Sequence, residues 1–146
     1  MNTNSDRAIE FMLSWEKYLS EVPGDPGGKT IWGITSKYFP EIVAQLEKQT
    51  ESESRGTAKS WYYQNVWLKN NCDHLPSPLD IFHFDSCVNP GPGAASEIMA
   101  HSGNDPLRYL LLRINYYKKR AEVSDSAKQS FRGWVNRVIQ LFILYG

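Results

Sequence analysis

A run of proline and glycine at residues 23–28, Pro-Gly-Asp-Pro-Gly-Gly, interrupts a segment that otherwise has the pattern of an amphipathic helix. Hydrophobic residues precede this run at helical spacing: Ile9, Met12, Leu13 and Leu19. With start signals at Ser5 and Asp6, they predict a first helix over residues 6–20. Because proline lacks an N–H donor and glycine is entropically costly in a helix, the chain must turn after it. We expect a turn or short hairpin that ends near Gly33.

The middle of the chain carries further helix signals. Thr35 or Ser36 is expected to cap a second helix that reaches about Leu46. The polar residues 47–57 are typical of an exposed connection. Thr57 is then expected to open a third helix across the aromatic cluster that follows it.

Three later helix starts follow from small polar residues: Ser77 before Pro78, Asn104 before Pro106, and Ser124. Proline suits the first helical position because its missing N–H would be unpaired there in any case. The starts predict helices that end near Val88, Ala121 and Leu144, with one more over residues 93–101. Six or seven helices with no convincing strand pair, no repeat and no shift of composition predict one mainly α domain over residues 1–146.

Charge is unevenly distributed although the formal net charge is zero. Residues 108–146 hold eight of the 16 basic residues and two of the 16 acidic ones. Such a basic C-terminal part attracts a polyanion such as teichoic acid or nucleic acid, or it complements the acidic remainder within one fold. We favour the second interpretation and expect no nucleic-acid partner. The basic Tyr116–Arg120 segment is then a solvated helix face.

Neither a cofactor nor a metal is expected. Cys72 and Cys87 form no CxxC pattern, and the histidines His74, His83 and His101 lack metal-ligand spacing. The N-terminus has no basic and apolar leader pattern, and no apolar run approaches a membrane span. We therefore expect a cytosolic origin, reduced thiols and no stable membrane insertion.

Glu16, Asp25 and Thr30 have spacing that suits glycosidic bond hydrolysis. That reaction commonly uses one carboxylic acid to protonate the leaving oxygen and a second carboxylate across the sugar. Glu16 on a helix beside aromatic residues is expected to be the desolvated acid, and Asp25 on an exposed turn the ionised group. Thr30 offers a hydroxyl that helps Asp25 to hold a water. Spacing alone is a weak signal, since these residue types recur often.

Four blocks in order resemble the glycoside hydrolase family 108 N-acetylmuramidases. The first is Glu16 followed by Asp25-Pro-Gly-Gly, Thr30 and Gly33-Ile-Thr. The others are "YYQNVW" at residues 62–67, "LPSPLDIFHFDSCVNPGPGAA" at residues 75–95 and "FRGWVNRV" at residues 131–138. The resemblance implies a lysozyme-like helical fold and the hydrolysis of peptidoglycan.

The resemblance also implies roles for residues. Glu16 is then the catalytic acid, and the wider phage-type lysozyme pattern suggests Asp25 and Thr30 as the pair that positions water. One departure stands out, because this chain has Lys17 and Tyr18 where the family usually has two glycines, and Leu19 where it has an aromatic residue. These side chains are expected to narrow or reshape the cleft, or Lys17 is expected to act on Glu16 through its charge.

Five residues are candidates to bind the sugar chain: Trp32, Tyr38, Tyr62, Asn89 and Tyr117. The four aromatic residues have faces that stack on sugars, but each also suits a core. Asn89 either bonds an N-acetyl group or caps a helix end, one turn after Asp85. We expect Asp85 to support the fold by bonding a neighbouring backbone group or a tyrosine, and Trp134 to lie in the core.

The sequence therefore predicts a monomeric muramidase that cuts the β-1,4 bond between N-acetylmuramic acid and N-acetylglucosamine. Its partner is the peptidoglycan glycan strand. We expect a phage or prophage endolysin that waits in the host cytoplasm and reaches the periplasm or cell wall after holin-dependent release, with a delivered effector as the other route. Two other classes stay open: a non-catalytic peptidoglycan-binding or phage structural protein, and a nucleic-acid binder.

Overall fold

The computed structural model describes residues 3–20 and 28–146 of the chain, so the predicted catalytic residue Asp25 lies outside the described residues. The α-helices in these ranges are α1 (Thr3–Trp15), α2 (Pro40–Glu47), α3 (Glu51–Tyr62), α4 (Leu79–Val88), α5 (Pro92–Ser102), α6 (Pro106–Val123) and α7 (Asp125–Tyr145). The remaining elements are β1 (Leu19–Ser20), β2 (Thr30–Ile31), β3 (Ile34–Thr35), the π-helical η1 (Tyr63–Leu68) and the 3₁₀ turn η2 (Cys72–His74). The predicted mainly α fold is confirmed.

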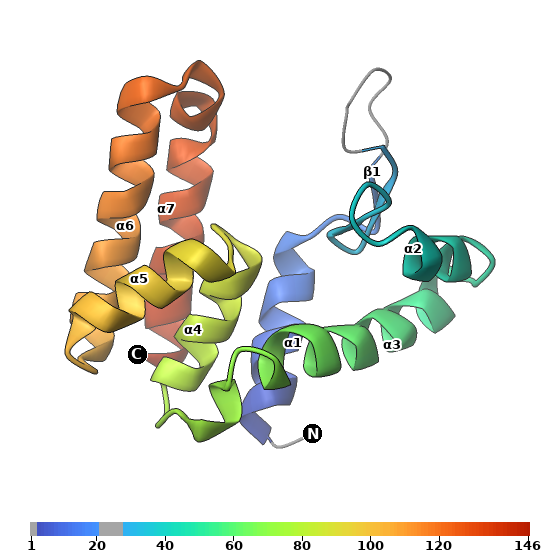
Figure 1. The fold of residues 1–146 in the computed structure, drawn as a ribbon, viewed down its shortest axis with the longest axis horizontal. Helices are drawn as coiled ribbons and strands as arrows, with labels where there is room; N and C mark the ends of the chain where they lie inside the picture. The colour runs from blue at the N-terminus through green and yellow to red at the C-terminus, as the bar shows by residue number, and fades with distance from the viewer. Residues whose placement is uncertain (1–2, 21–27) are drawn as a thin grey trace.

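Helix α4 is the centre of the fold. Every residue from Leu79 to Cys87 is buried, so this helix is covered on all sides, as expected for a helix that crosses a core. Helices α1, α5 and α6 pack directly against it. Figure 1 shows α6 and α7 side by side as an antiparallel pair at one end, with the strands, α2 and α3 at the other end. Helix α1, whose last residue directly precedes Glu16, therefore packs on the centre of the fold.

The first helix is shorter than its pattern predicts. It ends at Trp15, and the expected extension to residue 20 is wrong, because Leu19 and Ser20 pair with Ile31 and Thr30 in a small sheet. The sheet has the order β1-β2-β3, and both neighbouring pairs are antiparallel. The expected turn over residues 23–28 lies almost entirely outside the described residues, while the expectation of no convincing strand pair is wrong. Two-residue strands give too little alternation to be recognised in a sequence.

The start of α2 and the residues before α3 also differ from prediction. Helix α2 begins at Pro40 without a side-chain cap, so neither Thr35, which is in β3, nor Ser36 caps it as predicted. Helix α3 begins at Glu51, so the expected exposed connection over residues 47–57 is wrong. Thr50 caps α3, and its side chain and backbone exchange hydrogen bonds with Glu53. That reciprocal cap is encoded as Thr-x-x-Glu and was available in the sequence.

Three helix caps can be compared with their predictions. Ser124 caps α7 through its hydroxyl, as predicted. Helix α6 is capped by Asp105 and not by Asn104, because the Asp105 carboxylate accepts a hydrogen bond of 2.7 Å from the Arg108 N–H. Helix α4 starts one residue later than predicted, since Pro78 itself is its N-cap and Ser77 makes no cap.

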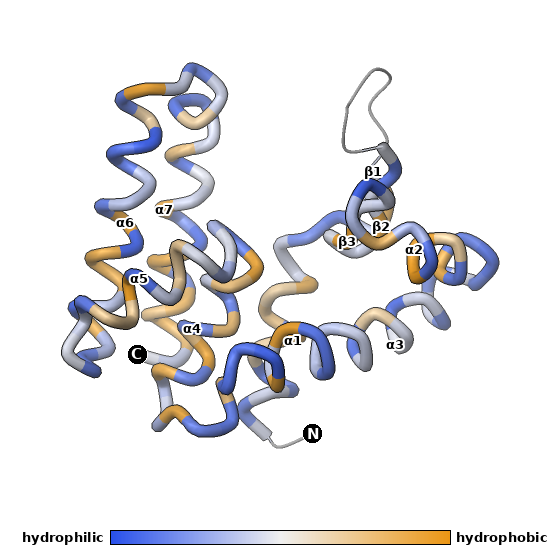
Figure 2. The backbone as a smooth tube through the Cα atoms, viewed as in Figure 1, coloured by the Kyte–Doolittle hydropathy of each residue, from blue (hydrophilic) through white to orange (hydrophobic). Residues whose placement is uncertain are grey.

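Most basic residues of the C-terminal part lie on the exposed faces of α6 and α7. Figure 2 shows hydrophobic and hydrophilic residues alternating along both helices, the pattern of helices that bury one face. Two of their arginines, Arg113 and Arg137, are buried, while the six other basic residues of this part are exposed. Among the described residues, no helix is both long and apolar enough to cross a membrane.

Candidate active site

Glu16 directly follows the last residue of α1. Its backbone N–H still donates to the Met12 carbonyl at 3.1 Å, so the residue keeps a helical position although the helix ends at Trp15. Its side chain is 25% exposed and accepts a hydrogen bond from Arg137 Nη1 at 3.2 Å. The carboxyl group is thus held from one side while part of it stays open to solvent.

The turn between β2 and β3 packs against Glu16. Trp32 and Gly33 form this two-residue turn with φ values of 50° and 82°, both in the left-handed region that type I′ hairpin turns require. A Cβ on Gly33 would lie 3.1 Å from Glu16 Cγ and 2.7 Å from Tyr62 Oη. Glycine is therefore needed twice here, for its backbone conformation and for the close approach of the turn to Glu16.

Two predicted sugar-stacking residues, Trp32 and Tyr62, stabilise this turn through buried hydrogen bonds. Trp32 is buried, and its indole N–H donates to Ser54 Oγ at 2.9 Å. The Tyr62 hydroxyl, also buried, donates to the Trp32 carbonyl at 2.7 Å. Burial raises the pKa of Tyr62, and the nearby Glu16 charge raises it further. Both rings belong to the core, although Tyr62 also borders a cavity.

Three hydroxyl side chains share one face of the sheet. The register aligns Ser20 with Thr30 and Thr30 with Thr35, and directly paired residues point to the same face. All three residues are half-buried. The Thr35 hydroxyl oxygen is buried and has no hydrogen-bond partner within residues 3–20 and 28–146. Thr30, the predicted water-holding residue, is therefore one of a row of three hydroxyls.

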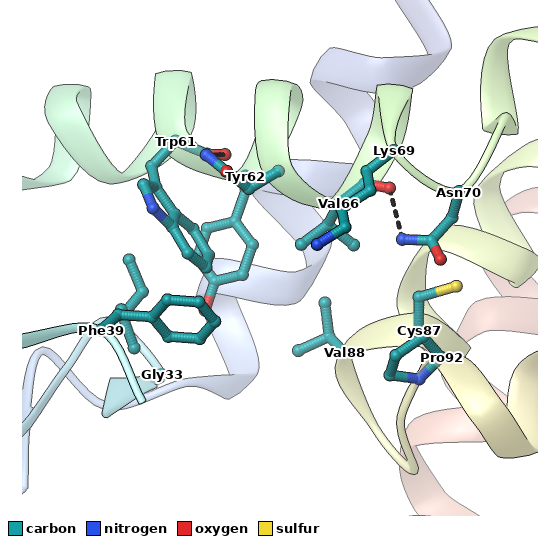
Figure 3. A pocket seen from close by; sticks show the side chains of 12 residues that line it. Gly33, Phe39, Trp61, Tyr62, Val66, Lys69, Asn70, Cys87, Val88 and Pro92 are labelled. Atoms are coloured by element: carbon teal, nitrogen blue, oxygen red, sulfur yellow. Dashed lines mark hydrogen bonds between the residues drawn. The ribbon is translucent and has the colours of Figure 1, made fainter. Parts of the chain in front are cut away.

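A cavity of about 250 Å³ opens beside the turn and Glu16's neighbours. Figure 3 shows its lining from Gly33, Phe39, Trp61 and Tyr62 on one side to Val88 and Pro92 on the other. Phe39 and Trp61 pack edge to face, with ring centroids 4.9 Å apart. Gly33 and Tyr62 are shared by this cavity and the surroundings of Glu16. An apolar cavity with aromatic walls and a few polar side chains has the general features of a ligand site.

Behind Glu16 lies a buried ionic cluster. Asp85 on α4 accepts hydrogen bonds from Arg137 Nη2 at 2.7 Å and from Arg113 Nη2 at 2.8 Å. The side chains of Asp85 and Arg113 are fully buried. Burial alone would raise the pKa of Asp85, but the two arginines lower it below its usual range. The expected backbone or tyrosine partner of Asp85 is wrong, because the arginines of α6 and α7 occupy its carboxylate.

The sequence matches a known protein family. The model of the glycosyl hydrolase 108 family matches residues 9–91, more than half of the chain. The chain belongs to the glycosyl hydrolase 108 family. The matched range contains Glu16, the turn at Gly33 and the central helix with Asp85, whereas both arginines of the cluster lie beyond it.

This glycosyl hydrolase 108 chain also has a structural relative. The match is to a structure described as "Structure of Brucella abortus SagA", with a TM-score of 0.67 and 20% sequence identity. It covers 94% of this chain and 90% of the Brucella abortus chain. At this identity the likeness shows a shared fold. None of the curated proteins searched matches the sequence.

The remaining sugar-binding candidates of this glycosyl hydrolase are divided between surface and interior. Tyr38 is 69% exposed, with Lys37 Nζ 5.3 Å from its ring centroid. Tyr117 is buried and stacks on Trp134 at 4.7 Å, so this ring packs inside the protein. Its hydroxyl donates to the carbonyl and to Oδ1 of Asn89, both at 2.9 Å. Asn89 is half-buried at the end of α4, and its amide is held in one orientation.

Lys17 and Tyr18, which stand where the resemblance leads us to expect two glycines, differ in burial. Lys17 is exposed. Tyr18 is half-buried and packs on Trp32, with ring centroids 5.1 Å apart, while its carbonyl accepts from the Trp32 N–H at 2.9 Å. Tyr18 therefore supports the turn that contacts Glu16.

The two cysteines and the possible metal-binding side chains form no site within the described residues. Cys72 and Cys87 are buried free thiols, and burial raises the pKa of Cys87 to about 12. In residues 3–20 and 28–146, His, Cys, Asp and Glu side chains nowhere gather in the groups of three or more that could hold a metal ion. Trp134 is half-buried against the core.

Sequence reasoning missed the two arginines and the importance of Gly33. Arg137 lies within the block at residues 131–138, but its pattern does not indicate burial. Arg113 follows four hydrophobic residues or tyrosines in α6, and a basic residue inside such a run was the available signal. The contact between Gly33 and Glu16 forms because β2 and β3 pair, and the sequence pattern did not reveal that pairing.

Proposed function

We propose that this glycosyl hydrolase cleaves the β-1,4 bond between N-acetylmuramic acid and N-acetylglucosamine in peptidoglycan, with Glu16 as the general acid. The observation that carries the proposal is the position of Glu16. Its carboxyl group is held by Arg137 and packed by the turn at Gly33, a residue that also lines the cavity with aromatic walls. A fixed and partly exposed carboxyl group can protonate a leaving oxygen.

The second half of the reaction needs an activated water. We assign this role to Asp25 and Thr30, since Thr30 lies on β2, in the hairpin whose turn packs against Glu16. If Asp25 acts as a base, the anomeric carbon is inverted, which requires about 6.5–9.5 Å between the two carboxyl groups. Proton NMR of the first product formed distinguishes inversion from retention.

Asn89 and Tyr38 are the substrate-binding candidates with accessible polar or aromatic groups. The Tyr117 hydroxyl bonds the oxygen of the Asn89 amide and so leaves the amide N–H groups to donate. An N-acetyl carbonyl is a matching acceptor. Tyr38 offers an exposed ring to a sugar face.

The test compares purified wild type with Glu16→Gln on outer-membrane-stripped Gram-negative cells and on isolated sacculi. Glu122→Gln is the matched control, because it removes one carboxylate from an exposed position on α6. We expect wild type and the control to release fragments with muramic-acid reducing ends, identified by mass spectrometry. Glu16→Gln should bind sacculi but release none.

Three other outcomes would contradict the proposal. Glucosamine reducing ends would assign the other glycosidic bond, and anhydro-muramic ends would show cleavage without water. Binding without cleavage by folded wild type would favour a peptidoglycan-binding protein.

We also propose an endolysin role, in which a holin releases the enzyme from the host cytoplasm to the wall. The resemblance of Glu16, Asp25 and Thr30 to the phage-type lysozyme pattern supports this role. Expression in bacteria with and without a holin tests it. Lysis that requires both the holin and Glu16 is the expected result, and equal lysis without the holin would contradict it.

A further inference from the structure

Four charged side chains from four parts of the chain meet beside the candidate active site. Glu16 follows α1, Asp85 lies on α4, Arg113 on α6 and Arg137 on α7. The side chains of Asp85 and Arg113 are 0% exposed, and that of Arg137 is 5% exposed. Glu16 is the only one of the four with substantial exposure. A proton that Glu16 gains or loses therefore changes the charge of a buried cluster.

Asp85 determines which part of the Arg137 guanidinium faces Glu16. It accepts from Arg137 Nε at 3.0 Å and from Nη2 at 2.7 Å, a paired contact across one edge of the planar group. This leaves Nη1 to donate to Glu16 at 3.2 Å. Rotation of the guanidinium would break the paired contact, so Asp85 fixes the donor that Glu16 meets.

Arg113 balances the charge of this arrangement. Its Nη2 donates to Asp85 at 2.8 Å and to the Asn89 carbonyl at 2.6 Å, and its Nε donates to Tyr117 Oη at 3.3 Å. With Glu16 ionised, two acids and two bases make the cluster neutral. With Glu16 protonated, the cluster carries one positive charge, which is unfavourable in a buried place.

We propose that Asp85 and Arg113 are positioning residues for the hydrolysis, which act through Arg137 to set the pH range over which Glu16 can donate its proton. The inference rests on the proposed function, because it takes Glu16 as the acid. Neither residue touches the solvent-exposed side of Glu16. Both act by orientation and by charge.

The other titratable groups near the cluster are either uncharged at neutral pH or exposed to solvent, so the four residues determine its charge. Burial raises the pKa of Tyr62 on α3, Cys87 on α4 and both Tyr109 and Tyr117 on α6, so these groups are uncharged at neutral pH. Burial lowers the pKa of His83, whose Nδ1 lies 3.1 Å from Tyr109 Oη, and so favours its neutral form. The cationic Lys17, beside Glu16 in the sequence, and Lys69, on the cavity wall, are exposed to solvent.

The proposal predicts opposite effects for two substitutions. Arg113→Met removes a positive charge, so protonated Glu16 is favoured and the alkaline limb of the pH–activity profile should move up by about one pH unit. Asp85→Asn removes a negative charge, so the same limb should move down by about one pH unit. A role in folding alone would lower activity in both variants without moving the limbs in opposite directions.

Two further variants make the test specific. Arg113→Lys keeps the charge and should retain the wild-type limb. Arg132→Met removes one arginine charge from an exposed position on α7 and should also leave the limb in place. If Asp85→Asn does not fold, the comparison of Arg113→Met with Arg113→Lys decides alone.

The experiment measures the release of reducing ends from sacculi between pH 4 and pH 9 by the full chain, with circular dichroism as the check on folding. Limbs of Arg113→Met and Arg113→Lys that coincide with wild type, or shift equally, would overturn the inference while wild type still cleaves and Glu16→Gln does not. No cleavage by wild type would instead contradict the proposed function.

Discussion

Two regions hold Glu16 by different kinds of interaction, one by ionic hydrogen bonds and the other by close packing. On one side, Asp85, Arg113 and Arg137 form a buried ionic cluster whose members come from α4, α6 and α7. On the other side, the backbone at Gly33 contacts Glu16 through a two-residue turn. The first region fixes an orientation by charge, and the second fixes a distance by shape.

The two regions also differ in what supports them. The ionic cluster uses charge-assisted hydrogen bonds between segments far apart in the sequence. The turn is held by neutral hydrogen bonds, from Tyr62 to the Trp32 carbonyl and from Trp32 to Ser54. A buried charge that loses its partner costs more than a neutral group that does so. Damage to the cluster should therefore reduce stability more than damage to the turn.

The largest expected effect comes from Arg137→Met. The substitution leaves Glu16 without its arginine and Asp85 with Arg113 as its remaining guanidinium partner. We expect a loss of about 3–5 kcal/mol in the free energy of unfolding, because it breaks a buried ion pair. Urea unfolding followed by circular dichroism measures it. A loss as small as that of Arg132→Met would contradict the structural role of the cluster.

Gly33→Ala tests the turn. The new Cβ would meet Tyr62 Oη and Glu16 at a residue whose φ is 82°. We expect a loss of about 1–3 kcal/mol and a large fall in activity, since Glu16 must move. Gly56→Ala is the matched control, because a Cβ there meets nothing within 4 Å and alanine favours the α3 helix. Equal stability and activity of Gly33→Ala and wild type would contradict the close packing on Glu16.

The contrast between these regions also explains what the sequence could predict. Local signals were sufficient for the cap at Ser124, because it depends on neighbouring residues. The cap of α3 at Thr50 is equally local, but the polarity of residues 47–57 indicated an exposed connection instead. The candidates Glu16, Thr30 and Asn89 follow from their residue types and from the resemblance of the sequence to a family.

The ionic cluster could not be predicted in the same way. Asp85 and Arg137 are 52 residues apart, and Arg137 and Glu16 are 121 apart. No local period connects such residues. The aromatic candidates Trp32 and Tyr117 show the same limit, because a ring that suits a sugar also suits a core, and burial decides between the two.

Tyr62→Phe measures the neutral support of the turn. It removes the hydroxyl that donates to the Trp32 carbonyl and keeps the ring in place. We expect a loss of about 1–2 kcal/mol, since a buried carbonyl is left without its donor. Chemical unfolding and the rate of sacculus cleavage check it. A loss equal to that of Arg137→Met would remove the difference between the two regions.

The smallest expected effect concerns an ionic link that is exposed. Glu10 on α1 accepts from Arg55 Nη1 on α3 at 3.1 Å, and its hydrogen bonds with Arg55 and, to a lesser extent, Lys59 lower the pKa of Glu10 to about 2. A lowered pKa means that the stabilisation is present above about pH 4.5 and is lost as the pH falls towards 2. Because the side chains are 36% and 40% exposed, we expect Glu10→Gln to cost less than about 1 kcal/mol at pH 7. Urea unfolding of both proteins at pH 7 and at pH 2.5 should show a difference that shrinks in acid. A difference that grows in acid, or one as large as that of Arg137→Met, would show that exposure does not separate this link from the buried cluster.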